Sequence, residues 1–376
     1  MTEREFLEVI SGGRQGVSAH LVRAGLTLAS GAYALGIMAR NLACDLRWLP
    51  VHQTGIPVIS IGNITTGGTG KTPFAAWIAQ WFRTRGVRVC LVSRGYGAEP
   101  GTPNDEALVL EQLCPDVPHL QNPDRVRSAQ VAREELASQL VLLDDGFQHR
   151  RLARDLDIVL IDALNPFGYG HLLPRGLLRE PRRALRRAQQ LVVTRVDQAD
   201  PTRLNELLAE LQALHPDADL AQVAFPLRGL ISAQGRRESL GRLRDQPVAA
   251  FCGIGNPGAF EASLAGTGAR VVAFSAWADH QSYGRDEMAR LEGWIREFRP
   301  ALVVTTQKDL VKIQAERIAG VPVWALEQGV EVISGQDQLE QKLAGVQQRI
   351  PPDEWSDDAS GMEGSSPEAD SGSAPG

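Results

Sequence analysis

The chain has 376 residues, 43% apolar and 22% charged, a composition typical of a soluble globular protein with two or three domains. Its net charge of −6 arises in residues 351–376, which hold seven acidic residues and no basic one; the remainder, near +1, is not basic enough to suggest a nucleic-acid-binding protein. The four cysteines are far apart and form no CxxC pair, which argues against a zinc site or a disulfide framework and fits a reducing compartment.

The first predicted element is a helix near the N-terminus. The run AGLTLASGAYALGIMA (24–39) has sixteen residues without a charge, flanked by Arg23 and Arg40. A membrane-spanning helix needs about 20 apolar residues, so a span is disfavoured. Two interpretations remain open: a helix buried in the protein, or a helix in the membrane interface with arginines toward the headgroups and Trp48 at the boundary.

Short apolar runs rich in Val and Ile recur along the rest of the chain. They occupy residues 56–62, 87–93, 139–145, 156–163, 190–195, 248–255, 270–275, 301–306 and 321–326. Helical patterns lie between several of them, for example at 72–86 and 201–216. Continuous apolar strands that alternate with helices predict an α/β fold with a mainly parallel sheet covered by helices on both faces. The segment 225–246 lacks the strand rhythm and is the expected junction with a second, smaller α/β domain.

A candidate phosphate-binding loop, ITTGGTGKTP (64–73), follows the first of these strands and opens a helix. Its glycines allow backbone N–H groups to turn toward a phosphate, and the helix N-terminus adds a positive dipole end. We expect Lys71 to reach the β- and γ-phosphates and the Thr72 hydroxyl to bind Mg²⁺. The loop residues expected to contact nucleotide are Gly67, Gly68, Thr69 and Gly70. Thr65 stands where the usual pattern has its first glycine.

A pair of carboxylates ends a later strand. In LVLLDDGFQHRRLARD the apolar run stops at Asp144 and Asp145, as in the carboxylate pattern that accompanies a phosphate loop and holds Mg²⁺. The alternative is a pair of solvated turn residues. Further on, nine arginines lie between residues 150 and 187, which fits either a solvated helix face or a surface for an anionic substrate or membrane.

Together these motifs resemble the tetraacyldisaccharide 4′-kinase family of lipid A biosynthesis, over about residues 15–345. The resemblance is carried by GNITTGGTGKTP (62–73), LVSRGYG (91–97), NDEALVL (104–110), PDRVRSA (123–129), DDGFQHRRLARDLDIVLID (144–162), GYGHLLPRGLLREP (168–181), GIGNP (253–257), DHQSY (279–283) and TTQKDLVKI (305–313), in the family's order. Threonine in place of the first loop glycine is usual in that family.

The resemblance implies a P-loop NTPase-like kinase that transfers the γ-phosphoryl group of ATP to the 4′-hydroxyl of a lipid-linked glucosamine disaccharide 1-phosphate. The protein would act as a peripheral enzyme on the cytoplasmic face of the bacterial inner membrane. The implied catalytic residues are Lys71, the general base Asp105 and its partner His280; the implied metal residues are Thr72, Glu106, Asp144 and Asp145. Gln148 and His149 would lie near the nucleotide, and Arg125 and Arg179 would contact substrate phosphate.

Four regions are therefore predicted. They are an amphipathic, membrane-associating helical segment (1–49), a P-loop kinase core (50–228), a smaller C-terminal α/β domain (229–349) and a disordered acidic tail (350–376).

Two other functions remain as alternatives. One is a GTPase-type switch, because TRVD (194–197) faintly resembles a guanine-reading element; the other is a partition-type ATPase, although Thr66 stands where such loops carry a signature lysine. A GTP preference, or hydrolysis stimulated by a protein without any lipid acceptor, would favour the respective alternative.

Overall fold

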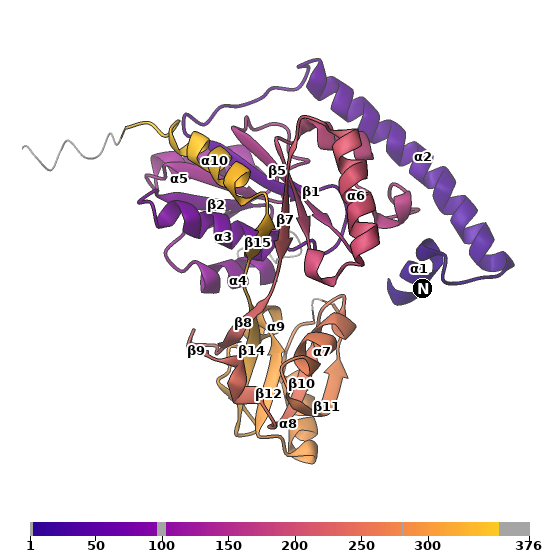
Figure 1. Cartoon of the computed structure of the whole chain (residues 1–376), viewed down its shortest axis with the longest axis vertical. Helices are drawn as coiled ribbons and strands as arrows, with labels where there is room; N and C mark the ends of the chain where they lie inside the picture. Colours follow the sequence, from indigo (N-terminus) through magenta and orange to yellow (C-terminus); the bar gives the residue numbers. More distant parts are fainter. Residues whose placement is uncertain (1–2, 96–102, 280, 353–376) are drawn as a thin grey trace, which may run out of the picture.

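The structure is a computed structural model that describes residues 3–95, 103–279 and 281–352. His280 and the acidic segment from residue 353 onward, for which the sequence made predictions, lie outside the described residues. Figure 1 shows a larger sheet domain, a smaller sheet domain below it, and a long N-terminal helix along the larger one.

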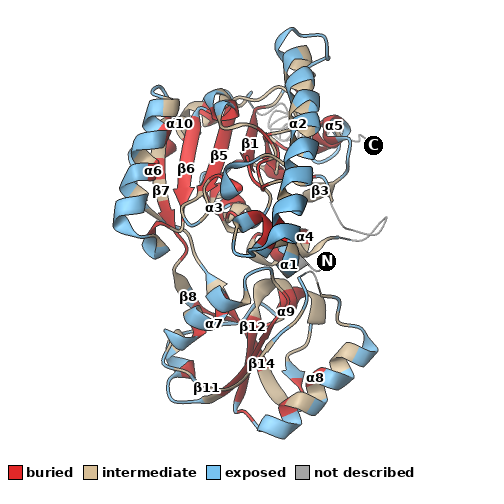
Figure 2. Ribbon diagram, turned by 90° about the vertical axis from the view of Figure 1, so that its right-hand side faces the viewer, coloured by how far each residue is buried: buried red, intermediate tan, exposed pale blue. Residues whose placement is uncertain are grey.

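The larger domain is built on an eight-stranded sheet with the order β15-β7-β6-β5-β1-β4-β2-β3. Its strands are β1 (Val58–Asn63), β2 (Val89–Ser93), β3 (His119–Gln121), β4 (Leu140–Asp144), β5 (Leu156–Asp162), β6 (Gln190–Thr194), β7 (Asp219–Ala224) and β15 (Glu331–Ser334). Every neighbouring pair is parallel except β15 with β7. The central strands β1 and β4 are buried along their whole length, as their mostly apolar sequences predicted (Figure 2).

Helices pack on both faces of this sheet. The helices of this domain are α3 (Lys71–Arg83), α4 (Asp105–Leu113), α5 (Arg125–Glu134), α6 (Pro201–Leu214) and α10 (Gln336–Gln347), with a short 3₁₀ helix at Arg182–Arg187. One apolar cluster joins α3, α4 and α10 to one face, and two others join α5 and α6 to the opposite face. The predicted P-loop-type α/β architecture is confirmed.

The smaller domain has a second sheet, with the order β11-β10-β12-β14-β8-β9 and with β13 paired to β14. Its strands are β8 (Leu227–Ile231), β9 (Arg237–Glu238), β10 (Pro247–Cys252), β11 (Arg270–Ala276), β12 (Leu302–Thr306), β13 (Arg317–Ile318) and β14 (Val321–Gln328). Its helices are α7 (Pro257–Ala265), α8 (Arg285–Phe298) and α9 (Gln307–Ile313). α7 packs on one face of the sheet, and α8 and α9 pack on the other.

An antiparallel ribbon of two chain segments connects the two sheets. β8 continues β7, and β14 runs into β15; β14 pairs with β8 in the small sheet and β15 pairs with β7 in the large one (Figure 1). Two sequence-based predictions are corrected by this arrangement. The segment 225–246 contains the strand β8, and β15 with α10 return to the larger domain, although 229–349 was expected to form the smaller one.

The N-terminal region forms α1 (Glu3–Ser11) and the long helix α2 (Val17–Asp45). α2 is long and apolar enough to cross a membrane by length and composition, and its most apolar window contains no buried residue. One face of α2 nevertheless contacts the larger domain: Ser30 Oγ donates to the Leu172 carbonyl at 2.9 Å and Tyr33 Oη to the Arg179 carbonyl at 3.0 Å. The helix is therefore neither buried in the protein nor detached from it.

Candidate active site

The phosphate-binding loop joins β1 to α3. Gly70 caps the helix at φ 84°, and a Cβ at this position would lie 2.3 Å from the Phe225 ring, so glycine is required both by the backbone and by space. Asn63 Nδ2 donates to Thr69 Oγ1 at 3.2 Å, and Thr194 Oγ1 donates to the Thr69 carbonyl at 3.0 Å. The loop is thus fixed from the ends of two strands and leads directly into the N-terminus of α3, a position that can bind an anion.

Arg195 braces the same loop from outside. Its guanidinium donates to the Gly68 carbonyl and forms an ion pair with Asp162, the last residue of β5. Arg195 itself has a left-handed backbone conformation at φ 57°. The TRVD element that faintly resembled a guanine reader therefore supports the phosphate loop in this structure.

The carboxylate pair lies next to this loop because β4 is the direct neighbour of β1, with Asp144 opposite Ile61. Lys71 Nζ lies 3.6 Å from Asp145 Oδ1. Asp145 has φ 52°, a rare conformation for a residue with a side chain and one that concentrates at functional sites. A Cβ on the next residue, Gly146, would approach Ser60 Oγ to 2.7 Å. The turn after β4 therefore packs so closely against Ser60 of β1 that it has no room for a side chain at Gly146.

Asp144 is the more buried member of the pair, with only 2% of its surface exposed. Burial, followed by repulsion from Glu106, raises the pKa of its carboxyl to about 7, while Lys71 opposes this rise. Among the described residues, Asp144 Oδ1 finds no hydrogen-bond partner. A buried carboxylate oxygen without a donor, beside a phosphate loop, is what an added cation would satisfy.

Asp145 is surrounded by cations. Arg179 Nη1 lies 2.9 Å from Asp145 Oδ1 and 2.7 Å from Oδ2, and Arg125 Nη1 donates to the Asp145 carbonyl at 3.2 Å. Burial opposes ionisation of Asp145, but Lys71 and Arg179 outweigh it and hold the pKa of this carboxyl below its ordinary value. Both arginines that the family resemblance selected therefore contact Asp145, Arg179 at its carboxylate and Arg125 at its backbone carbonyl.

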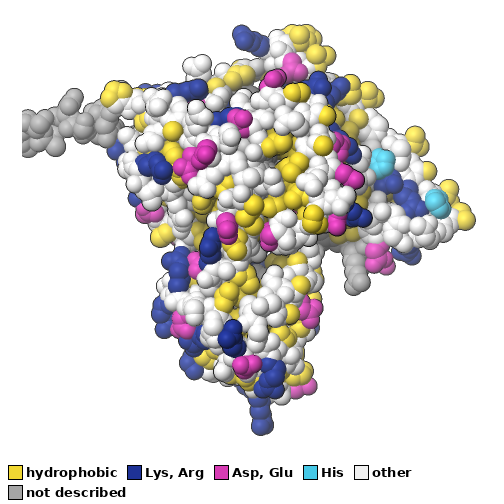
Figure 3. Space-filling model, viewed as in Figure 1, with side chains coloured by type: hydrophobic (Ala, Val, Ile, Leu, Met, Phe, Trp, Pro, Cys, Tyr) yellow, Lys and Arg dark blue, Asp and Glu magenta, His cyan; other side chains and the backbone are white. Residues whose placement is uncertain are grey.

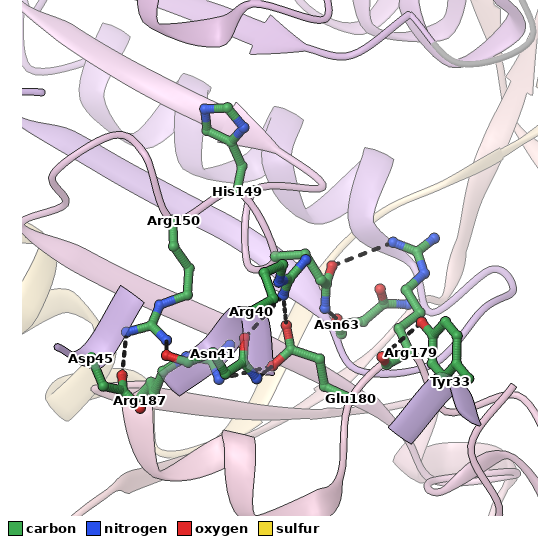
Figure 4. A network of polar contacts seen from close by, with 12 residues as sticks. Tyr33, Arg40, Asn41, Asp45, Asn63, His149, Arg150, Arg179, Glu180 and Arg187 are labelled. Carbon is green, nitrogen blue, oxygen red and sulfur yellow. Dashed lines mark hydrogen bonds and ion pairs between the residues drawn. The ribbon is translucent and has the colours of Figure 1, made fainter. Parts of the chain in front are cut away.

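Gln148 and His149 take different positions. Gln148 Nε2 donates to the Asn63 carbonyl at 2.8 Å, and Gln148 Oε1 accepts from Arg179 at 3.5 Å, so this side chain joins the loop to Arg179. The His149 ring points away from the Arg179–Glu180 cluster (Figure 4). Burial and the nearby Arg125 lower the pKa of His149 to about 4, so its ring is neutral at pH 7.

Asp105 and Glu106 are the first two residues of α4. Asn104 caps this helix by accepting from the Ala107 amide at 3.0 Å. α4 packs against α9 of the smaller domain. Asp105 Oδ2 lies 3.2 Å from Lys312 Nζ, and Glu106 Oε1 lies 4.0 Å from Lys308 Nζ, so two lysines of the smaller domain face these carboxylates.

Lys312 is itself held inside the smaller domain. It lies 3.7 Å from Asp309 and donates to the Gln281 carbonyl at 2.8 Å. Asp309 is fully buried and accepts from Tyr283 Oη at 2.8 Å and from Thr306 Oγ1 at 2.6 Å. Lys312 thus links Asp105 to the residue that follows His280.

The lysines facing α4 were missed in the sequence, although their scarcity could have revealed them. The chain has only four lysines, and two of them are Lys308 and Lys312. Lys308 and Lys312 lie in TTQKDLVKI, a motif already noted. Glu180 was likewise missed: it lies beside Arg179 and has no exposed surface.

The described residues contain no preformed group of three or more His, Cys, Asp or Glu side chains around a metal position. Mg²⁺ is usually bound through one or two protein carboxylates together with substrate phosphates, so such a group is not required. The side chains positioned to contribute are the Asp144 and Asp145 carboxylates and the Thr72 hydroxyl, since Thr72 is the second residue of α3. The arrangement suits transfer of a phosphoryl group from a nucleotide.

Comparison with known proteins agrees with this geometry. The family model described as Tetraacyldisaccharide-1-P 4′-kinase matches residues 22–348. A tetraacyldisaccharide 4′-kinase from Anaeromyxobacter sp. (strain Fw109-5) is 40% identical over 338 residues, covering 85% of this chain and 90% of the relative. One from Geobacter metallireducens is 39% identical over 313 residues, covering 78% and 89%.

A solved structure is also similar. LpxK from Aquifex aeolicus, crystallised in complex with ATP, superposes with a TM-score of 0.69 at 28% identity, and the match covers 86% of this chain and 99% of that chain.

Proposed function

The chain belongs to the tetraacyldisaccharide-1-P 4′-kinase family, and we propose that Lys71, Asp105 and the Asp144–Asp145 pair carry out its reaction. It is a kinase that uses ATP to phosphorylate the 4′-hydroxyl of tetraacyldisaccharide 1-phosphate, giving lipid IVA in lipid A biosynthesis. This assignment replaces the alternatives of a GTPase-type switch and a partition-type ATPase.

One observation carries the proposed site: Lys71 lies 3.6 Å from Asp145, where the phosphate loop and the end of β4 meet. In a direct test, purified protein is incubated with Mg-ATP and tetraacyldisaccharide 1-phosphate, and the lipid is analysed by mass spectrometry for one added phosphate. The same lipid without ATP serves as the control, and no added phosphate from folded protein would contradict the function.

The roles of the side chains follow from their charges. Lys71 neutralises charge on the transferring phosphoryl group, and the loop amides hold the β-phosphate. Asp105 accepts the proton of the attacking 4′-hydroxyl, with His280 as its partner. Arg125 and Arg179 bind acceptor phosphate, and Gln148 with His149 border the nucleotide.

Magnesium is the cation that fits the carboxylate pair. Asp144 has a buried oxygen without a hydrogen-bond donor among the described residues, and Glu106 lies close enough to raise its pKa. Asp144, Asp145, Thr72 and Glu106 are the residues that would hold Mg²⁺, and the ion would supply positive charge to neutralise the phosphates.

Removing this carboxylate should therefore be severe. Asp144→Asn is expected to lower kcat/KM by at least about 10²-fold, because the site loses the charge that holds the cation. The measurement is a Mg²⁺ titration of turnover, together with chelation and re-addition of Mg²⁺ to the unaltered protein. Asp116→Asn, which removes a carboxylate paired with Arg83 on the surface, is the matched control. Full activity of Asp144→Asn at low Mg²⁺ would exclude this metal site.

The outer face of α2 is the proposed membrane contact. Four leucines at intervals of seven residues point to solvent: Leu21, Leu28, Leu35 and Leu42 are 68%, 80%, 69% and 55% exposed. Hydrophobic side chains line the outer edge of this helix (Figure 3), and no charged residue occurs from 24 to 39. The inner face is occupied by contacts with the larger domain, so the helix suits interfacial attachment. Because ATP is supplied in the cytoplasm, we assign the protein to the cytoplasmic face of the inner membrane.

This attachment can be tested without removing α2. In the double variant Leu28→Asn/Leu35→Asn, each lost leucine should weaken membrane partitioning roughly 10-fold, from about 1.5 kcal/mol of apolar transfer. Flotation with phospholipid vesicles measures the effect. The control, Leu164→Asn/Ile333→Asn, alters two exposed residues outside α2. Unchanged flotation of the double variant would show that these leucines do not anchor the protein to the membrane. A change between monomer and dimer, seen by light scattering without lipid, would show instead that the leucines bind a second copy of the chain.

A further inference from the structure

Glu180 is a carboxylate with no exposed surface, and three donors surround it. Arg40 Nη2 lies 2.8 Å from Oε1, while Asn41 Nδ2 at 3.3 Å and Arg187 Nη1 at 2.8 Å approach Oε2 (Figure 4). Arg40 and Asn41 belong to α2, whereas Arg187 belongs to the short 3₁₀ helix of the larger domain. A buried charge requires such partners, so Glu180 fixes α2 at one position on the domain.

The preceding residue, Arg179, connects this contact to the active site. Its Nη1 holds both oxygens of Asp145, at 2.9 and 2.7 Å. Its amide donates to the carbonyl of Ile64, the first residue of the phosphate loop, at 2.7 Å, and its carbonyl accepts from Tyr33 of α2 at 3.0 Å. The backbone of Arg179 is therefore clamped between the phosphate loop and the N-terminal helix.

The same segment makes a second contact with the loop. The Thr66 amide donates to the Leu177 carbonyl at 2.7 Å, and Thr65 and Leu178 form an isolated antiparallel bridge. Residues 177–180 thus form a strip between α2 and the phosphate loop. A displacement of α2 would act on this strip, because Tyr33, Arg40 and Asn41 all bind its last two residues.

We propose that Glu180 is a positioning residue for phosphoryl transfer, which seats α2 on residues 177–180 and thereby holds Arg179 against Asp145. The inference rests on the proposed function of the Asp144–Asp145 site. It gives α2 a role in turnover that is separate from membrane attachment. Such a role explains why contacts to α2 converge on the neighbour of an active-site arginine.

The test uses full-length protein in detergent micelles with saturating tetraacyldisaccharide 1-phosphate, so that membrane attachment does not limit the rate. Glu180→Gln should lower kcat by about 10-fold or more, since small displacements of a positioning group have effects of this size. The dissociation constant of an ATP analogue should change by less than about twofold, because the loop lysine and amides remain.

Tyr33→Phe is the milder variant and avoids a buried uncompensated charge. Loss of the single hydroxyl that binds the Arg179 carbonyl should lower kcat roughly fivefold. Ser30→Ala is its matched control: it also removes one hydroxyl from the inner face of α2, but Ser30 binds Leu172 and Arg175 instead. Equal losses in the two variants would overturn the proposal, because any loosening of α2 would then suffice.

A double-mutant cycle separates positioning from general stability. If Glu180 acts through Arg179, adding Glu180→Gln to Arg179→Ala should lower kcat by less than about twofold further. If the double variant loses kcat by the product of the two single losses, the proposal is wrong. It is also wrong if Glu180→Gln has a normal kcat per folded molecule and differs only in a lower melting temperature. Failure of the proposed function would look different, since the unaltered protein itself would then not phosphorylate the lipid.

Discussion

Lys71→Ala is expected to reduce kcat by at least about 10²-fold while the fold is retained. Lys71 opens α3 and lies 3.6 Å from Asp145, so its ammonium is placed where negative charge gathers on the transferring phosphoryl group. A rate loss of this size corresponds to several kcal/mol of transition-state stabilisation. Steady-state kinetics with saturating ATP and lipid measures the change, and circular dichroism verifies the fold.

Lys342→Ala is the matched control for this variant. Lys342 lies on α10 and pairs with Asp219 at 2.7 Å, away from the phosphate loop, so its loss should leave kcat within about twofold. If folded Lys71→Ala retained near-normal activity, the assignment of the phosphate loop would be wrong.

Asp105→Ala is the second variant with a large expected effect. As the proposed acceptor of the hydroxyl proton, Asp105 should contribute about 10²–10⁴-fold to kcat, and ATP affinity should be nearly unchanged. The carboxylate sits at the N-terminus of α4 and 3.2 Å from Lys312, so the smaller domain contacts it across the seam between the domains. Glu111→Ala, on the same helix and exposed, is the control.

His280 is tested in the same experiment. If Asp105 and His280 act as one unit, the double variant should be far less impaired than the product of the two single losses. If the double variant instead loses activity by the product of the two single losses, His280 is a substrate-binding or structural residue and not the partner of Asp105. Lys312 binds the carbonyl of Gln281, the residue after His280, which supports testing the two together.

The strands at the centre of the larger sheet were predictable because their burial is written into the sequence. β1, β4 and β5 are buried almost throughout, so each reads as a mostly apolar run. The Gly-rich loop after β1 and the aspartates at the end of β4 were predictable from their residue types and their position after a strand. Their proximity then follows from the topology of a parallel sheet, whose carboxyl ends meet at one edge.

The ribbon that joins the domains was not predictable in this way. β15 is only four residues long and largely exposed, and it pairs with β7, more than one hundred residues earlier. Such a strand has no apolar run of its own, because its stability comes from a partner distant in sequence. That pairing brings α10 back to the larger domain. Because the pairing cannot be read from the sequence, α10 was predicted to belong to the smaller domain.

The sequence by itself determined the sheet class, the phosphate loop, the carboxylate pair and the family, because each depends on local patterns or on contiguous motifs. Only the tertiary structure decided which charges meet. Lys312 reaches Asp105 from the other domain, and Arg40 of α2 reaches Glu180 across 140 residues of sequence. Ion pairs between distant segments leave no periodic trace, since their energy depends on burial and distance that only folding creates.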